Sequence, residues 1–277
     1  MIRDFRIDSI REIFHSVKIM KSVVRSLSLL AAVSAALPLS AATLAHRYSF
    51  NGDTADSVGG NNGVLLNGAS VSSTHLTLPG TGSGAGAANM GFTSIVGIGT
   101  NFGSSGVTIE SWYTDNGSGT WSKLFTFGTS NAGQEIAFTN FRGGGDLAPG
   151  LDRNGNHFLA GYPGGSNTRL STGTEHHLVV AVASDGTTNL WVDGTQQITN
   201  LATNPLSSVV SSTESIGATA WNDPGHNGTV NEFRIWSGTL TGDEVTRNLG
   251  LGPNVVPEPM TLAMVALGLL GIFRRRR

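Results

Sequence analysis

The acidic side chains in the central part of the chain are the first candidates for catalysis. A retaining glycosidase needs two carboxyl groups about 5 Å apart, which one strand supplies only when both face the same side. Glu110 and Asp115 are five residues apart, so alternation along a strand sends them to opposite faces. Glu135 has no acidic neighbour within four residues. We therefore expect no catalytic residue, although carboxylates distant in sequence can still meet in the folded chain.

Aromatic residues in loops point to a different chemistry, because sugars stack on aromatic rings that have polar groups beside them. Trp121, Tyr162 and Trp221 fall in or beside segments rich in Gly, Asn and Asp, and Trp221 is followed by Asn222 and Asp223. We predict a carbohydrate-binding site from these five residues. The alternative is that the loop tryptophans only cover an edge of the core. Three other tryptophans lie within predicted strands and are expected to serve the core: Trp112, Trp191 and Trp236.

Metal binding is the third chemistry to consider. Asn51, Asp53 and Asp56 lie in one glycine-rich loop, and such oxygen ligands suit a structural calcium ion. The alternative is ordinary turn chemistry, for which Asn, Asp and Gly are favoured anyway. His176 and His177 are adjacent, so on a strand they face opposite sides and do not share a metal. We expect one of them to be exposed and the other packed or hydrogen-bonded.

The C-terminal segment has three parts in a fixed order. Pro257-Glu258-Pro259 forbids helix, because proline fixes φ and lacks an N–H. Residues 260–273 carry no charge and form an apolar run, about 21 Å long as a helix. Four arginines end the chain: Arg274, Arg275, Arg276 and Arg277. Arginines beside an apolar helix are expected to stay cytoplasmic and to reach the interface. The alternative is a core helix with a basic tip.

The N-terminal segment has the pattern of a secretory signal. Lys18, Lys21 and Arg25 form a basic region, followed by the apolar run 27–37 and the small-residue site 40–42. The acidic residues before Met20 are unusual in such a region, so translation starts either at Met20 or at Met1 with a long basic region. In either case residues 1–42 are left out of the fold.

Charge and cysteine content exclude several classes of function. The 277 residues include no cysteine, so disulfides and cysteine catalysis are excluded. Of 17 Lys and Arg residues only seven lie in 43–256, against 15 of the 19 acidic residues. This acidic domain is a poor binder of nucleic acid.

Residues 43–253 have the pattern of an all-β sandwich. Short alternating runs are separated by clusters of Gly, Asn, Ser, Thr and Asp. We predict strands at 45–50, 64–66, 76–78, 107–114, 123–127, 134–139, 158–162, 178–183, 189–192, 215–218 and 230–236. The run 178–183 is apolar on both faces and is predicted to be a central strand, in a hairpin with 189–192. Thr241 and Glu244 form a capping box that predicts one helix, ended by Gly250 or Gly252.

The order of these pieces resembles the laminin-G-like, concanavalin A-like jelly-roll family. The matching stretches are FNGDTADSVGGNNG, TIESWY, HHLVVAVASDGTTNLWVDG and VNEFRIWSGTLTGDEV. The resemblance implies a two-sheet antiparallel jelly-roll sandwich with one short, capped C-terminal helix. Related jelly-roll glycosidases carry Glu-x-Asp-x-Glu on one strand, and this sequence has no such motif.

The C-terminal segment is similar to the PEP-CTERM sorting signal of Gram-negative bacteria. This resemblance implies cleavage near Pro257-Glu258-Pro259 by an exosortase-type protease, after passage through the export translocon and cleavage by signal peptidase. We therefore expect three parts: an extension and signal peptide (1–42), a sandwich domain (43–253) and a sorting signal with a transmembrane helix (254–277). The expected product is a non-catalytic module of the envelope, surface or extracellular matrix that binds carbohydrate or another surface polymer. The alternatives are a structural matrix protein without a ligand and a glycoside hydrolase or lyase.

Overall fold

The computed structural model describes residues 42–80, 88–89, 98–143, 148–159, 169–210 and 212–256. All of them belong to one compact unit, residues 41–277. The predicted signal peptide up to residue 41, the predicted sorting segment 257–277 and Tyr162 lie outside the described residues. Within the described part of the chain, no helix has the length and apolar character that a membrane span requires.

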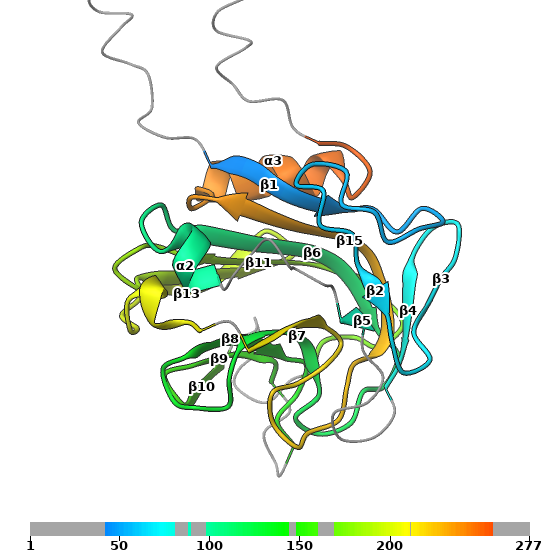
Figure 1. Cartoon of the computed structure of the whole chain (residues 1–277), viewed down its shortest axis with the longest axis horizontal. Helices are drawn as coiled ribbons and strands as arrows, with labels where there is room; N and C mark the ends of the chain where they lie inside the picture. Colours follow the sequence, from blue (N-terminus) through cyan, green and yellow to red (C-terminus); the bar gives the residue numbers. More distant parts are fainter. Residues whose placement is uncertain are drawn as a thin grey trace, which may run out of the picture. The chain divides into compact units, whose positions relative to one another are not determined.

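Alternating apolar residues give the described chain two antiparallel sheets (Figure 1). The first has eight strands in the order β13-β12-β11-β6-β15-β4-β3, and β1 also pairs with β15. Its strands are β1 (Thr43–Tyr48), β3 (Ser70–Val71), β4 (Leu76–Pro79), β6 (Val107–Asp115), β11 (Glu175–Val182), β12 (Thr188–Val192), β13 (Thr195–Leu201) and β15 (Asn227–Ser237). The predicted central strand is confirmed, because β11 lies between β6 and β12.

The second sheet has seven strands in the order β10-β9-β8-β7-β14-β5-β2. Its strands are β2 (Val64–Leu65), β5 (Ala88–Asn89), β7 (Lys123–Gly128), β8 (Glu135–Thr139), β9 (Gly150–Arg153), β10 (Asn156–Leu159) and β14 (Thr213–Ile216). Two short helical segments, α2 (Ile98–Phe102) and η1 (Leu206–Ser208), contact each other. The chain therefore has the predicted two-sheet sandwich architecture.

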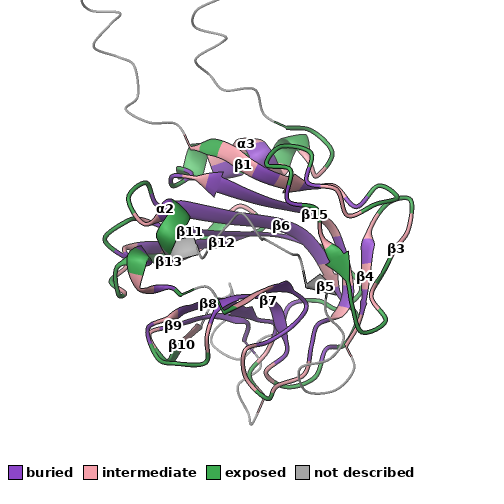
Figure 2. Ribbon diagram, in the orientation of Figure 1, coloured by how far each residue is buried: buried purple, intermediate pink, exposed green. Residues whose placement is uncertain are grey.

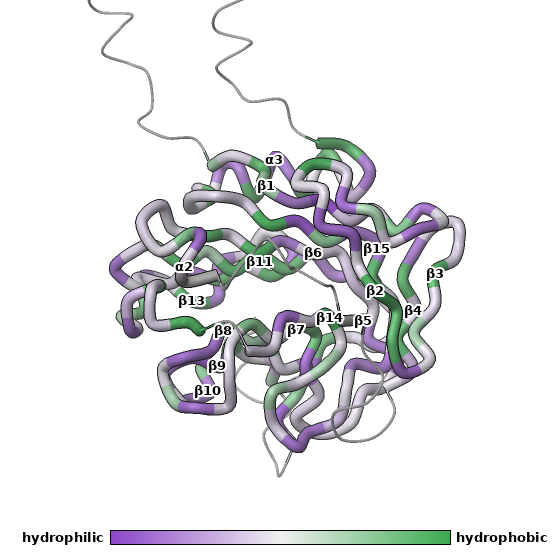
Figure 3. Tube along the Cα trace, in the orientation of Figure 1, coloured by the Kyte–Doolittle hydropathy of each residue, from purple (hydrophilic) through white to green (hydrophobic). Residues whose placement is uncertain are grey.

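The main core lies between the two sheets. Phe233 of β15 contacts Phe125 of β7 edge to face, with ring centroids 5.9 Å apart, so the inner faces of the sheets interlock. Ile136 and Phe138 of β8 belong to the same buried cluster. Figure 2 shows the long strand β6 buried along most of its length, and Figure 3 shows hydrophobic and hydrophilic positions interspersed along the strands. The outward-facing residues of the second sheet, which alternate with this core, build the site described below.

The outer face of the eight-stranded sheet is covered by α3 (Gly242–Leu251). We call this face, with α3, the covered face. The predicted capping box is confirmed: Glu244 N–H donates to Thr241 Oγ1, and Thr241 N–H donates to Glu244 Oε2. Val245 of α3 packs in a second cluster with residues from the sheet and the segment before the helix, namely Val179, Ala181, Trp191, Trp236 and Leu240. This helix explains why β11 is apolar on both faces.

A buried charge network lies under α3. Glu110 is fully buried, and it accepts hydrogen bonds from Trp236 Nε1 (2.9 Å) and Asn248 Nδ2 (3.0 Å) and pairs with His177 Nε2 (2.9 Å). Burial alone raises the pKa of Glu110, but the His177 bond and the Arg234 charge outweigh it and lower the pKa below its ordinary value. The covered face therefore has its central carboxylate fully paired within the chain.

Some strand predictions differ from the structure. β10 covers Asn156–Leu159 rather than 158–162, and four strands were not predicted: β3, β5, β9 and β13. β13 is an edge strand with mostly exposed polar side chains, so it lacks the apolar alternation used to find strands. β9 is only four residues long and is set by its hairpin with β10, which a search for apolar runs does not detect.

Candidate functional site

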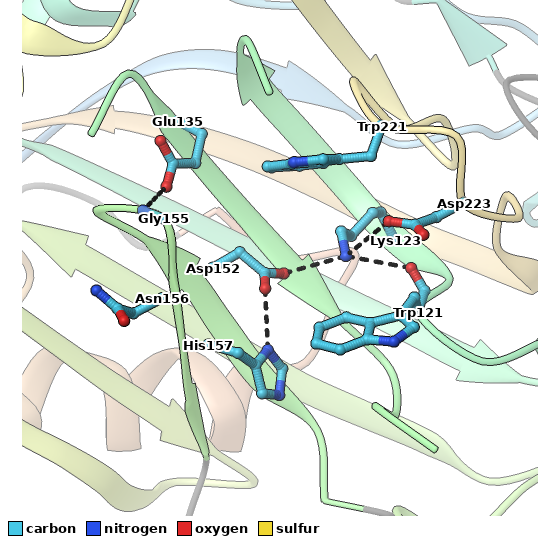
Figure 4. A pocket seen from close by; sticks show the side chains of 9 residues that line it. All are labelled: Trp121, Lys123, Glu135, Asp152, Gly155, Asn156, His157, Trp221 and Asp223. Carbon is cyan, nitrogen blue, oxygen red and sulfur yellow. Dashed lines mark hydrogen bonds and ion pairs between the residues drawn. The ribbon is translucent and has the colours of Figure 1, made fainter. Parts of the chain in front are cut away.

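The candidate site lies on the outer face of the seven-stranded sheet, which we call the pocket face. Because Ile136, Phe138 and Leu151 point into the core, alternation directs Glu135, Thr139 and Asp152 outward. These strands and two flanking loops surround a pocket of about 260 Å³ (Figure 4). Its lining residues are Trp121, Lys123, Glu135, Asp152, Gly155, Asn156, His157, Trp221 and Asp223.

Lys123 at the start of β7 forms the centre of the site. Its ammonium donates to Thr139 Oγ1 (2.8 Å) and to the Trp121 carbonyl oxygen (3.2 Å). It also forms ion pairs with Asp152 (3.4 Å) and Asp223 (3.5 Å). Lys123 is 2% exposed, and such a buried ammonium is stable only when its charge and donors are satisfied in this way.

Trp121 and Trp221 lie on either side of that ammonium (Figure 4). Lys123 Nζ is 5.1 Å from the centroid of each ring, within cation–π range. Trp121 adopts φ +63°, a left-handed conformation that costs free energy in a bulky residue and aims its ring toward the pocket. The exposed Arg142 lies 5.4 Å over the same ring, and His157 meets its edge.

Asp152 and His157 are aligned by a hairpin turn. Asn154 and Gly155 both have positive φ, 57° and 68°, the type I′ geometry that Asn-Gly favours between two strands. This turn pairs Asp152 of β9 with His157 of β10, and His157 Nδ1 lies 2.9 Å from Asp152 Oδ1. Asp152 is also hydrogen-bonded by Thr139. Both oxygens of Asp152 are therefore engaged within the protein.

Glu135 differs from Asp152 in its hydrogen bonding. Its side chain is fully buried, and Oε1 accepts a hydrogen bond from Gly155 N–H (2.6 Å). No described protein group donates to the other oxygen, Oε2. Figure 4 shows this oxygen on the side of the carboxylate away from Gly155. Two buried side-chain atoms of residues that line the pocket therefore lack a partner among the described protein groups: Glu135 Oε2 and His157 Nε2.

The loop that carries Trp221 and Asp223 is anchored by His226. His226 is fully buried, donates from Nε2 to the Thr114 carbonyl (3.1 Å) and accepts at Nδ1 from Asn140 (2.8 Å). Burial lowers the pKa of His226 to about 4, so its neutral form holds the loop. Burial raises the pKa of Asp223 above its ordinary value, although Lys123 acts in the opposite direction.

The structure brings together three of the five residues predicted to bind carbohydrate: Trp121, Trp221 and Asp223. Asn222 is exposed and does not line the pocket, and Tyr162 lies outside the described residues. Sequence reasoning missed the strand residues Lys123, Glu135, Asp152, Asn156 and His157. Two signals point to them: Lys123 is the single lysine in 43–256, and Asn154-Gly155 is a strong hairpin signal.

In the loop predicted to bind calcium, the polar side chains form hydrogen bonds within the protein. Asp56 Oδ1 accepts from Arg47, Val58 and Gly59 N–H, and its Oδ2 accepts from Asn61 N–H. Two further contacts involve the other predicted ligands: Asp53 accepts from Ala55 N–H, and Asn51 donates to Asn254. No group of three or more His, Cys, Asp or Glu suited to a metal occurs among the described residues. Calcium binding here stays a prediction.

His176 and His177 face opposite sides of β11, as predicted, but the expected exposure of one of them is wrong. They are 6% and 2% exposed. His176 pairs with Asp193, and His177 pairs with Glu110 while stacking on Trp112. Both faces of β11 are buried, so each imidazole needs a hydrogen-bonding partner within the protein. Trp112, Trp191 and Trp236 are all buried, as predicted for strand tryptophans.

The fold is a two-sheet antiparallel β-sandwich that has a pocket on the outer face of one sheet. The model of the concanavalin A-like lectin/glucanases superfamily matches residues 93–246, and the chain belongs to that family. The model of the PEP-CTERM protein-sorting motif matches residues 255–277. This motif implies export and sorting to the cell surface with processing by an exosortase. A comparison with curated protein sequences gives no significant match.

Solved structures share this fold at low sequence identity. Domain 4 of AbnA, an extracellular arabinanase from Geobacillus stearothermophilus solved in complex with arabinotriose, has a TM-score of 0.58 and 18% identity. That match covers 75% of this chain and 98% of the other. Trypanosoma rangeli sialidase in complex with 2,3-difluorosialic acid has a TM-score of 0.50 and 17% identity, covering 84% of this chain and 39% of the sialidase. At these identities the likeness concerns the fold.

Proposed function

We propose that this protein is an exported, non-catalytic module that binds carbohydrate or a related surface polymer in the pocket between Trp121 and Trp221. The observation that carries the proposal is the combination of two indole rings with buried polar groups in one pocket. Sugar rings have apolar faces and polar edges, so they complement aromatic rings that have hydrogen-bonding groups beside them.

The size of the pocket bears on the length of ligand it accepts. At about 260 Å³ it is slightly smaller than the roughly 300–1,000 Å³ of pockets that enclose drug-sized ligands. We infer that it holds a single sugar unit, either a chain end or a branch, while the rest of the polymer stays outside. A long groove would instead be expected for a module that grips several consecutive units.

The pairing of the carboxylates supports a non-catalytic role. Asp152 is engaged by His157, Thr139 and Lys123, and Asp223 by Lys123, so neither is poised as a nucleophile. A glycosidase or lyase remains the alternative with a specific observation in its favour, because Glu135 and Asp152 lie on neighbouring strands of the same face. If the native protein releases reducing ends from a polysaccharide and Glu135→Gln or Asp152→Asn does not, the protein is a catalyst and the binding proposal is wrong.

Binding is tested with the protein as its host exports it, on immobilised polysaccharides that include the host's own. We expect Trp221→Ala to lower the affinity at least tenfold and Trp221→Phe to retain most of it, because Phe keeps an aromatic face. An unchanged melting temperature in both variants shows that the fold is intact. Absence of binding by the native protein to every polysaccharide would favour the alternative of a structural matrix protein without a ligand.

For the sorting segment we propose passage through the export translocon, signal-peptidase cleavage and transient anchoring by residues 260–273. Release to the envelope, surface or matrix of a Gram-negative bacterium follows. Changing Pro257-Glu258-Pro259 to alanines is expected to leave export intact and to retain an uncleaved, membrane-bound form. Replacing the four terminal arginines with glutamine is expected to let more full-length chain escape, a difference visible by fractionation and mass. Normal processing of the alanine variant in a host with the sorting machinery would contradict this proposal.

A further inference from the structure

The buried Glu135 carboxylate restricts what the pocket accepts. Its Oε2 has no donor among the described protein groups, while its Oε1 is held by Gly155. A buried carboxylate oxygen needs a hydrogen-bond donor, and a charged donor forms the stronger bond. A ligand carboxylate offers only acceptors and a like charge at this position. The position therefore suits a hydroxyl or an ammonium and disfavours a uronate.

The buried cations near the pocket are held by protein groups. Among the lining residues, three carboxylates face one ammonium, and the Lys123 ammonium is already committed to Asp152, Asp223 and neighbouring oxygen acceptors. Arg153 is buried, does not line the pocket and directs its guanidinium to the carbonyls of Glu135 and Asn204, while its charge also acts on the Glu135 carboxylate. Arg142 is exposed and lies over Trp121 without lining the pocket.

The two indoles already stabilise one ammonium in this pocket. Lys123 Nζ lies 5.1 Å from both ring centroids, so the rings stabilise a cation that the chain itself supplies. Resting on the carbohydrate-binding function proposed above, we propose that the pocket selects sugar units with a free amine over N-acetylated and uronic acid units. The amine would donate to Glu135 Oε2, and the sugar ring would pack against Trp221.

The test compares three oligosaccharides of equal length: oligo-glucosamine, oligo-N-acetylglucosamine and oligo-galacturonate. Calorimetry with the exported protein is run at low salt, at a pH at which the sugar amine is protonated. We expect at least tenfold tighter binding of the amine than of the acetylated form, and weaker binding of the uronate. High salt should shrink the preference for the amine, because screening weakens charge pairing.

Matched carboxylate-to-amide variants locate the effect. Glu135→Gln should reduce the preference for the amine to about twofold or less, whereas Asp243→Asn, in the exposed first turn of α3, should keep it. If Glu135→Gln does not fold, Asp223→Asn and the salt dependence of the native protein still decide, because both should reduce the preference.

Three results would overturn the inference. Equal binding of the amine and the acetylated form would remove amine selection while leaving carbohydrate binding in place. Preferred binding of the uronate, lost in Arg142→Gln, would assign selection to Arg142 instead. Absence of binding to all three oligosaccharides and to every other polysaccharide would remove the proposed function and this inference with it.

Discussion

The covered face and the pocket face are outer surfaces of the same sandwich. They differ in how completely a buried carboxylate is hydrogen-bonded within the protein. Under α3, Glu110 is bonded to His177, Trp236 and Asn248 and lies beside Arg234. On the pocket face, Glu135 is equally buried but keeps one oxygen without a donor among the described groups. A face sealed by a helix must satisfy its charges internally, whereas a face open to ligands can leave an acceptor for them.

The largest loss of stability is expected when the central carboxylate of the covered face is removed. Glu110→Ala removes the acceptor shared by His177, Trp236 and Asn248 and leaves Arg234 with one carboxylate partner fewer. We expect unfolding in urea to show a loss of about 3–5 kcal/mol. On the pocket face, Asp223→Asn should cost no more than about 1 kcal/mol, because its side chain is 28% exposed. Equal losses would contradict the contrast between the faces.

A second prediction concerns acid and the loop of the pocket face. The pKa of His226 is about 4 in the folded protein, below its ordinary 6.5, so the folded state binds fewer protons than the unfolded state between these values. The contribution of His226 to the free energy of unfolding is therefore complete above pH 6.5 and is lost as the pH falls to about 4. The loss is about 3 kcal/mol at 1.36 kcal/mol per pKa unit.

Urea unfolding at several pH values measures this loss. His226→Asn should be less stable at pH 7 and show a flatter decline toward pH 4. His176 of β11 serves as the control, because its pKa is raised: burial opposes the shift, but the Asp193 hydrogen bond outweighs it. Its contribution is full below its unfolded pKa and is lost as the pH rises through the folded value. If the free energy of unfolding of His226→Asn falls as much between pH 7 and pH 4 as that of the native protein, the role of His226 is contradicted.

A third prediction weakens the helix that distinguishes the covered face. Thr241→Ala removes the side-chain half of the capping box and should cost about 1 kcal/mol. Thr246→Ala is the matched control, because Thr246 is exposed and bonds back to the Gly242 carbonyl within the helix. This change should be neutral or slightly stabilising, since alanine favours helix. Similar losses in the two variants, measured by thermal unfolding, would show that the cap is unimportant.

The smallest expected effect lies outside both faces, in the loop of Asn51, Asp53 and Asp56. A calcium site of about millimolar affinity would add about 0.4 kcal/mol of stability at about 1 mM calcium, because the ion binds only the folded state. The melting temperature should rise slightly with calcium and fall with chelator, and Asp53→Asn should abolish the change. An identical melting temperature in calcium and chelator would show that these residues only form a turn and bind no calcium.

Features that depend on neighbours along the chain were predictable from the amino-acid sequence. Alternation in 107–114 and 230–236 predicted β6 and β15, and Thr241 with Glu244 predicted the start of α3. The sandwich followed from these pieces and their order. Trp121, Trp221 and Asp223 could be named as binding candidates because aromatic residues in polar loops need no distant partner to be noticed.

That these loop residues share a pocket with Lys123, Glu135 and Asp152 follows from the folding of the whole chain. The pairing of Ala137 with Asp152 brings β8 and β9 together, and the loop before β15 carries Trp221 to the same place. Strand register and sheet order join residues that are far apart in sequence, and their side-chain types alone do not specify the partner. For the same reason, the sequence pattern presented Glu135 as an isolated carboxylate, whereas in the folded chain it lines the same pocket as two tryptophans and a paired lysine.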